Sequence, residues 1–264
     1  MIVIDDGSSE NIEQIIRSYS DNRIFYFRHR KNLGLPNALN TGFSHSTGEY
    51  LTWTSDDNFY DNKALEVMVN FLEENLETTF VYTNYYTVSE NGEILESIRV
   101  SPPKVLDRKD CVGPCFLYRR KVYEKIGKYD SNFALAEDYE YWLRIREQFI
   151  MQELDEYLYF YRRHGDRLSA QNKSALIEEQ AAKASQKHIP LWARYYHQGW
   201  VCLYKKDYQR ATKFFIKSLF SNPFHFVVWA ALFYSFLSIF SPSFAESLRR
   251  LKNDLRARFN KSKR

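Results

Sequence analysis

The stretch YLTWTSDDN, residues 50–58, is the part of the sequence that most strongly indicates the fold. Apolar and β-branched residues lead into two adjacent carboxylates, Asp56 and Asp57, and Asn58 follows them. This pattern is typical of a buried strand that ends in acid. Ligands of open α/β sheets gather beyond the carboxyl ends of the strands, where paired carboxylates suit Mg²⁺ or Mn²⁺ holding a diphosphate. The alternative is a solvated turn in which Asp57 or Asn58 caps a helix that begins near Asn62.

The chain before this stretch alternates between strand and helix patterns. Residues 1–9 (MIVIDDGSS) predict a strand that runs into Asp5 and Asp6 and then turns. A helix, a strand over 24–28, a tight turn and a second helix that ends at Gly48 follow. The order β-α-β-α-β predicts parallel strands joined by right-handed crossovers.

The same alternation continues to about residue 164. We predict a helix over 64–72, a strand from 79, a hairpin turn at Asn91-Gly92, a strand over 113–119, a helix over 120–126, a helix starting near Glu137 and a strand over 158–164. The predicted fold class is therefore α/β, a mostly parallel sheet flanked by helices, with an all-α C-terminal region.

Composition limits the function classes. The 264 residues are enough for one good-sized domain and an appendage. The net charge of +4 is too small to indicate a nucleic-acid partner. The cysteines, Cys111, Cys115 and Cys202, form neither a metal-ligand pattern nor an even-numbered framework, which predicts a reducing compartment. Asp5 and Asp6 precede any long apolar stretch, so we expect no signal peptide and a cytoplasmic location.

Several spaced motifs occur together in the first two thirds of the chain. They are VIDDGS at 3–8, NLG at 32–34, GEY at 48–50 leading into SDDN at 55–58, Glu137-Asp138, and Arg163-His164. In this order and approximate spacing they resemble family-2 glycosyltransferases of the GT-A fold, over a predicted domain of residues 1–170. The family usually begins with one more β-α unit, which would precede residue 1 here.

The resemblance implies a nucleotide-sugar site at the ends of the first strands. Asp6 would contact uracil or another base with Asp5 in support, and Asn32 to Gly34 would form the loop beside the nucleotide. The structural alternative is that these residues form turns and helix caps. Asp56 would face the sugar or ribose.

The resemblance also implies a metal site and a catalytic base. Asp57 would bind the Mg²⁺ or Mn²⁺ ion that bridges the diphosphate, and His164, with Arg162 and Arg163 beside it, would close over the same group. Asp138 would take the proton of the acceptor hydroxyl as its oxygen attacks the anomeric carbon. Glu137 is the rival base or an acceptor-orienting partner; alternatively both acids favour only the helix dipole.

The activity that the resemblance implies is metal-dependent and inverting. It would move a sugar from a nucleotide-diphosphate donor to a hydroxyl of a saccharide or lipid-linked saccharide, in surface polysaccharide or glycoconjugate synthesis. Because the first β-α unit is missing, the alternative is an inactive glycosyltransferase-like binding protein. A nucleotidyltransferase with the same metal-diphosphate geometry is a third hypothesis.

The remaining residues predict helices. Residues 171–223 carry the small-and-aromatic spacing of a tetratricopeptide-like hairpin, namely Gly199, Tyr208, Ala211, Phe215, Ser218 and Pro223. In residues 224–264 an apolar run to Phe240 precedes eight Lys or Arg and two acidic residues. Two interpretations are open: a helix on an anionic membrane surface at the inner face of the membrane, or a helix buried in the tail's own hairpin.

Overall fold

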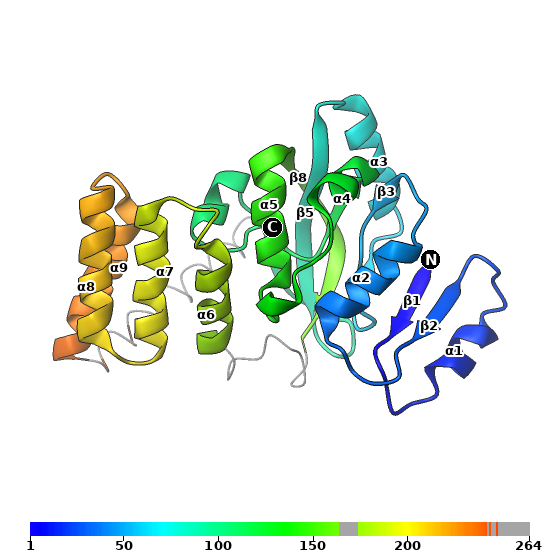
Figure 1. The fold of residues 1–264 in the computed structure, drawn as a ribbon, viewed down its shortest axis with the longest axis horizontal. Helices are drawn as coiled ribbons and strands as arrows, with labels where there is room; N and C mark the ends of the chain where they lie inside the picture. The colour runs from blue at the N-terminus through cyan, green and yellow to red at the C-terminus, as the bar shows by residue number, and fades with distance from the viewer. Residues whose placement is uncertain (164–173, 242, 244–246, 248–264) are drawn as a thin grey trace.

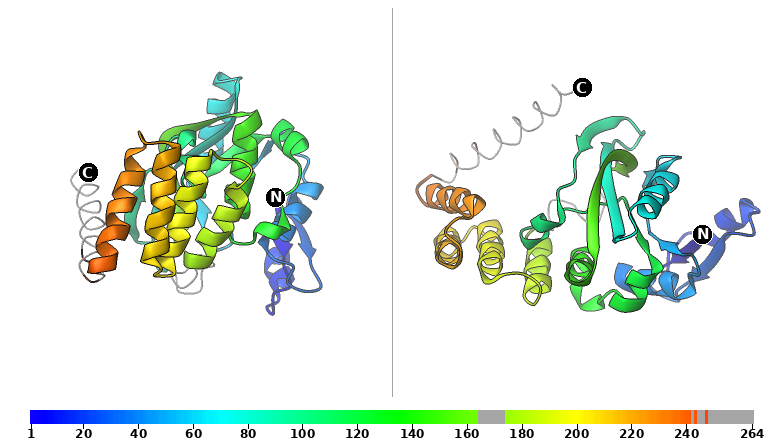
Figure 2. Two further views of the ribbon diagram at one scale, coloured as in Figure 1. Left: turned by 60° about the vertical axis from the view of Figure 1, so that its left-hand side comes forward. Right: turned by 90° about the horizontal axis from the view of Figure 1, so that it is seen from above.

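A computed structural model describes residues 1–163, 174–241, 243 and 247 (Figure 1). Strands and their covering helices form one end of an elongated molecule. Four helices stand side by side at the other end (Figure 2): α6 (Ser174–Ser185), α7 (Leu191–Tyr204), α8 (Tyr208–Ser221) and α9 (Phe226–Phe240). The predicted fold class, α/β followed by an all-α region, is confirmed.

The strands fall into two separate sheets. In chain order they are β1 (Ile2–Asp5), β2 (Phe25–Arg28), β3 (Tyr50–Leu51), β4 (Phe59–Tyr60), β5 (Thr78–Val88), β6 (Ile94–Ile98), β7 (Phe116–Arg119) and β8 (Ile150–Arg162). β1 and β2 form a parallel pair of their own. The larger sheet has the order β3-β7-β5-β8-β4, and β6 forms a hairpin with β5. Its long central pair, β5 and β8, is parallel, from Thr78↔Ile150 to Val88↔Arg162.

Two expectations about strands are corrected. Apart from β1-β2 and β5-β8, the pairings in the described chain are antiparallel, so the larger sheet is mixed rather than mostly parallel. The strand expected over 50–55 is only two residues long, and it pairs with β7 instead of β1 or β2. The reason is that side chains hold the stretch after Leu51: Thr52 Oγ1 donates to the carbonyl of Phe116 at 2.6 Å, which ends the backbone ladder there.

Helices of the β-rich part lie where the apolar spacing places them. They are α1 (Ile12–Ser18), α2 (Leu35–His45), α3 (Ala64–Glu74), α4 (Arg120–Ile126) and α5 (Glu137–Gln148), with single 3₁₀ turns η1 (Pro103–Asp107) and η2 (Ser131–Phe133). The predicted hairpin turn is also confirmed, with Gly92 at a φ of 85°.

The larger sheet is covered by helices on both faces. Successive side chains of a strand point to opposite faces. Phe80 and Tyr82 therefore belong to the cluster that contains Trp142 of α5, whereas Val81 belongs to the cluster that contains Met68 of α3. Cover on both faces explains why nearly every residue of β5 is buried, its threonines included.

The helical region shares the core of the β-rich part. One cluster of buried side chains extends from Trp142 to Trp192 and Phe215 in the helical region. Within that region α7 and α8 approach closely at Gly199, where a Cβ atom would lie 2.4 Å from the ring of Phe215. This contact shows an α7-α8 hairpin, and its tetratricopeptide-like character stays a prediction.

None of the helices in the described part of the chain is both long enough and apolar enough to cross a membrane.

Candidate active site

β1 ends at Asp5, whose side chain is buried. The backbone N–H of Ser8 donates to Asp5 Oδ1 at 2.7 Å, the hydroxyl of Tyr26 donates to Oδ2 at 2.6 Å, and Arg28 Nε lies 3.4 Å from Oδ2. Burial by itself raises the pKa of Asp5. The hydrogen bonds from Tyr26 and Ser8 and the charge of Arg28 outweigh burial and hold the pKa below its usual value. Asp5 therefore closes the turn after β1 as a carboxylate.

Asp6 fixes the loop before α2. The backbone N–H of Leu33 donates to Asp6 Oδ1 at 2.9 Å, and that of Gly34 donates to Oδ2 at 2.8 Å. His29 Nδ1 lies 2.6 Å from Oδ1, and Asn32 Oδ1 accepts a second hydrogen bond from Gly34 at 3.1 Å. Gly34 has a φ of 86°, which favours glycine. The structure thus brings Asp6, Asn32 and Gly34 together, as their shared role requires, although their contact with a nucleotide stays a prediction.

The Asp56-Asp57 turn lies between β3 and β4. Asp56 is exposed, and the half-buried Asp57 accepts a hydrogen bond from Ser55 Oγ at 2.5 Å through Oδ1. Two bonds fasten the turn to β8: Arg162 Nε donates to the carbonyl of Asp57 at 2.9 Å, and the backbone N–H of Arg162 donates to Asn58 Oδ1 at 2.7 Å. The backbone of the turn is therefore anchored to β8.

The helix-cap alternative for this turn is wrong. α3 begins at Ala64, after β4, and its N-cap Lys63 makes no side-chain capping bond. The carboxylate that serves the helix start is Asp61, which accepts from the backbone N–H of Lys63 at 2.9 Å. Asp57 and Asn58 are thus not needed as caps.

A second group of carboxylates lies at the start of α5. Glu137 is buried, and its Oε2 atom has no hydrogen-bond donor within the described chain. Burial and the negative charge of Asp138 raise the pKa of Glu137 to about 7. Burial also raises the pKa of Asp138, although the backbone N–H of Tyr139 donates to its Oδ1 at 2.7 Å. Each of these acids is therefore harder to ionise than a free carboxyl group.

Asp110, just after η1, belongs to the same group. Desolvation by the surrounding residues and the negative charge of Asp138 raise the pKa of Asp110 to about 7, while the residue remains accessible to solvent. Its Oδ1 accepts from the backbone N–H of Val112 at 3.0 Å. Because repulsion between charges is mutual, Asp110, Glu137 and Asp138 titrate as one group. Asp110 could not be predicted from the sequence, since a lone Asp between Lys109 and Cys111 carries no recognisable signal.

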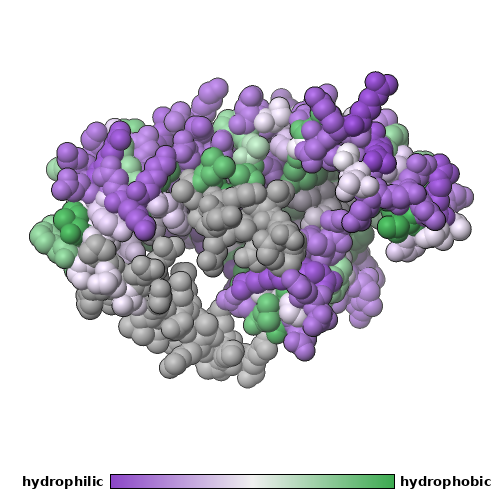
Figure 3. Space-filling model, turned by 90° about the horizontal axis from the view of Figure 1, so that it is seen from below, coloured by the Kyte–Doolittle hydropathy of each residue, from purple (hydrophilic) through white to green (hydrophobic). Residues whose placement is uncertain are grey.

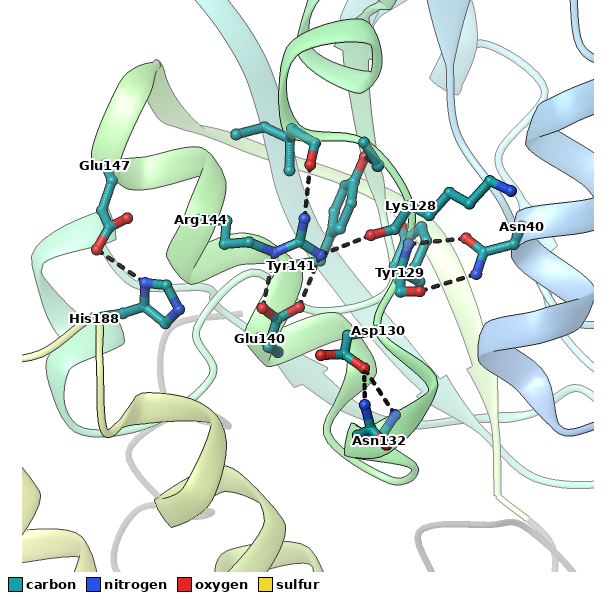
Figure 4. Close-up of polar contacts among 12 residues, drawn as sticks. Asn40, Lys128, Tyr129, Asp130, Asn132, Glu140, Tyr141, Arg144, Glu147 and His188 are labelled. Atoms are coloured by element: carbon teal, nitrogen blue, oxygen red, sulfur yellow. Dashed lines mark hydrogen bonds and ion pairs between the residues drawn. The ribbon is translucent and has the colours of Figure 1, made fainter.

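Tyr129 connects the segments that carry these acids. Asn40 on α2 holds the backbone of Tyr129 through two hydrogen bonds, Nδ2 to the carbonyl at 2.9 Å and Oδ1 from the N–H at 2.8 Å (Figure 4). Trp53, four residues before Asp57, donates to the Tyr129 hydroxyl at 3.0 Å. Burial raises the pKa of Tyr129, and the charge of Asp138 adds to that increase. α2, the segment that leads into the Asp56-Asp57 turn and the charge of Asp138 at the start of α5 therefore all act on Tyr129.

Arg144 fixes the loop that contains Tyr129. Its guanidinium binds both carboxylate oxygens of Glu140 at 2.8 Å and donates to the carbonyls of Ile126 at 2.8 Å and Lys128 at 2.9 Å (Figure 4). A bidentate Arg-carboxylate pair is geometrically rigid. Arg144 and Glu140 thus let α5 hold the loop in position.

His164 lies outside the described residues. Of its two neighbours, Arg162 donates to backbone carbonyls of the turn after β5 as well as to Asp57. Arg163 forms an ion pair with Glu96 at 2.8 Å. Both arginines therefore have partners in the protein itself.

Within the described ranges, no three His, Cys, Asp or Glu side chains lie close enough together to hold a metal ion. The turn offers two acidic side chains at most, Asp56 and Asp57. Mg²⁺ commonly binds one or two protein carboxylates and completes its coordination with substrate phosphates and water. The chemistry of this turn fits an ion bound together with a diphosphate.

The family model described as glycosyl transferase family 2 matches residues 1–127. This part of the chain is therefore similar to family-2 glycosyltransferases. A relative from Rickettsia bellii (strain RML369-C), an uncharacterized glycosyltransferase, is 32% identical over 180 residues, which cover 65% of this chain and 26% of the relative. The Escherichia coli protein WfgD, a UDP-Glc:alpha-D-GlcNAc-diphosphoundecaprenol beta-1,3-glucosyltransferase, is 25% identical over 150 residues, 55% of this chain and 57% of that protein. The chain thus spans less than two thirds of either relative.

A solved structure is similar to this chain in its fold. The S. aureus protein TarS (residues 1–349), in its complex with UDP-GlcNAc, is similar with a TM-score of 0.54 at 13% identity, over 89% of this chain and 69% of that chain. The GT-A-like fold expected from the motifs is thereby confirmed. The family match ends before Glu137 and Asp138, so these two acids lie beyond the matched part, whereas Asp110 lies within it.

Proposed function

We propose that this chain transfers a sugar, with inversion, from a nucleotide-diphosphate donor to a hydroxyl of a saccharide or lipid-linked saccharide. The observation that carries this proposal is the acid group of Asp110, Glu137 and Asp138 beside a family-2 domain. A general base works best when its pKa lies near the operating pH, and burial and like charges raise these carboxyl groups toward that range.

Asp138 is the proposed base. It accepts the proton of the acceptor hydroxyl while that oxygen forms a bond to the anomeric carbon. The bond between the anomeric carbon and the diphosphate oxygen breaks in the same displacement, so the configuration inverts and the nucleoside diphosphate leaves. Glu137 lies beside Asp138, whose negative charge raises the pKa of Glu137.

The donor is proposed to bind across the Asn32–Gly34 loop and the Asp56-Asp57 turn. Asp6 holds the Asn32–Gly34 loop, and it is proposed to contact the base with Asp5 in support. Asp56 would contact the ribose or sugar, and Asp57 would hold Mg²⁺ or Mn²⁺. When bound, such an ion neutralises charge on the departing diphosphate.

A lipid-linked acceptor is the preferred class. The name of WfgD describes a UDP-glucose donor and an acceptor on diphosphoundecaprenol. A chain related to it over 55% of its length is proposed to use a donor and acceptor of the same chemical classes, in the synthesis of a surface polysaccharide or glycoconjugate.

Donor binding tests this proposal directly. The measurement is titration calorimetry of the full chain with UDP-sugars and Mn²⁺, followed by nucleoside diphosphate release. Asp57→Ala is expected to abolish the Mn²⁺-dependent part of binding, and Glu66→Ala, an exposed acid on α3, serves as the matched control. Equal turnover in wild type and Asp57→Ala would remove Asp57 from the mechanism.

Binding without transfer is the second candidate. The observation that favours it is that β1 and β2 form a pair separate from the larger sheet, although they carry the proposed base-binding acids. In that case the chain would bind a UDP-sugar but release no UDP when offered acceptors. Release of pyrophosphate instead would indicate nucleotidyl transfer.

A further inference from the structure

Exposed aromatic side chains gather at the far end of the helical region. In residues 1–163 the large aromatic side chains that are exposed are Tyr19, Phe25 and Phe59. The end of α8, the following turn and α9 expose seven: Phe220, Phe224, Phe226, Trp229, Phe233, Phe236 and Phe240. Phe220, Phe224 and Phe226 are 87%, 95% and 81% exposed, so packing within the described protein does not explain them. Concentrated exposed aromatic surface marks an interaction site.

α9 has two distinct faces. The buried face consists of small residues that pack toward α8, among them Val228, Ala231 and Ser235, and Thr212 Oγ1 on α8 donates to Ser235 Oγ at 3.0 Å. The other face carries the aromatic residues at 226, 229, 233, 236 and 240, a spacing that places them in one stripe. A shallow apolar hollow of about 270 Å³ lies in this stripe, lined by Trp229, Leu232, Phe233 and Phe236. Because its first face is fixed on α8, α9 offers a partner only its aromatic face.

Positive charge is concentrated on α8 and in the sequence that follows α9. Arg210, Lys213 and Lys217 are exposed on α8, and Lys213 and Lys217 lead along one helix face to Phe220. The sequence contains no Asp or Glu from residue 208 to residue 245. It then carries eight basic residues against Glu246 and Asp254: Arg249, Arg250, Lys252, Arg256, Arg258, Lys261, Lys263 and Arg264. Figure 3 shows hydrophobic and hydrophilic side chains side by side at this end of the molecule.

We propose that the α8-α9 end docks on an anionic phospholipid bilayer, with the aromatic stripe of α9 inserted among the headgroups. Aromatic residues with an apolar body suit the interface, and each nearby Lys or Arg is attracted to anionic lipid. A second copy of this chain is disfavoured as the occupant, because pairing the two stripes would bring the basic residues of both copies together. This docking does not depend on the proposed transfer activity, although it would place the chain beside a lipid-linked acceptor.

Vesicle sedimentation with the full chain tests the proposal. The probes are vesicles of phosphatidylglycerol and phosphatidylcholine mixed, and vesicles of phosphatidylcholine alone. We expect binding to the mixed vesicles, lost in Phe224→Ser/Phe226→Ser, and weakened about fivefold for each lysine removed in Lys213→Gln and Lys217→Gln. The matched control, Tyr19→Ser/Leu76→Ser, removes two exposed apolar residues far from α9 and is expected to bind like wild type.

Three results would overturn the proposal. The first is wild type that binds neither vesicle or binds both equally. The second is undiminished vesicle binding by Phe224→Ser/Phe226→Ser, which would reduce the effect to charge alone. The third is a sedimentation-velocity result in which wild type self-associates and the same double variant does not, while both bind vesicles equally. Loss of sugar transfer with normal vesicle binding would bear only on the proposed function.

Discussion

At the end of β1, Asp5 and Asp6 accept hydrogen bonds from backbone amides, from the hydroxyl of Tyr26 and from His29. At the start of α5, Glu137 Oε2 is buried with no donor in the described chain, and Asp138 repels its acidic neighbours. Donors favour the charged form of an acid, whereas burial and like charges disfavour it. The first group therefore organises loops, and the second is suited to accept a proton near neutral pH.

The largest effect expected from this difference concerns Asp138. Asp138→Asn should lower sugar transfer by about 10²–10⁴-fold, since a positioned base contributes that much. Folding stability should not fall, because one of three mutually repelling charges is removed. The measurements are kcat and thermal unfolding, with Glu147→Gln at the other end of α5 as the control. A rate within a few-fold of wild type would make Asp138 a structural residue.

For Asp6, in contrast to Asp138, we expect a loss of folding stability. Asp6→Ala removes the acceptor for the amides of Leu33 and Gly34 and the partner of His29, so we expect a loss of about 1–2 kcal/mol in the free energy of unfolding. Urea denaturation measures it. Asp56→Ala is the control, because an exposed carboxylate should change stability by less than about 0.5 kcal/mol. Equal effects of the two substitutions would show that Asp6 does not hold its loop.

The two groups should also differ in how they link stability to pH. The folded-state pKa of Glu137 and of Asp110 is raised, to about 7, so their contribution improves as pH falls from 8 toward the usual carboxyl values. The folded-state pKa of Asp5 is lowered, so its contribution is present above the usual Asp value and is lost as pH falls through the lowered one. Denaturation at a series of pH values measures both. Glu137→Gln should reduce the gain between pH 8 and 5, and an unchanged gain would place its source elsewhere.

The sequence predicted the local elements well. The turn at Asn91-Gly92 and the helix over 120–126 depend on residues close together in the chain, and both appear as expected. The partner of β3 was not predictable, because the choice between β1 and β7 depends on contacts that the local pattern does not contain. For the same reason the period of the strand at 50–55 did not reveal that Trp53 would leave the sheet to reach Tyr129.

Some residues of the candidate site were likewise predictable from the sequence, and others were not. Asp6, Asn32 and Gly34 were predictable as a unit, since motif spacing carries their relation, and the structure brings them together. Asp110 and the clamp formed by Arg144 were not, because each acquires its role only from segments distant in sequence. Residues whose function comes from the folded arrangement leave no pattern along the chain.

The smallest expected effect concerns Asp110. Its repulsion with Asp138 makes both acids harder to ionise, so Asp110→Asn should move the acidic limb of the pH-rate profile to lower pH. On the acidic limb the variant should then be faster than wild type, while the two rates converge at higher pH, where Asp138 is ionised in both. Asp130→Asn, an acid on the loop that leads to α5, is the matched control and should leave the profile in place. A uniform decrease in rate at every pH would instead show that Asp110 binds the acceptor, because weaker acceptor binding slows the reaction whether or not Asp138 is ionised.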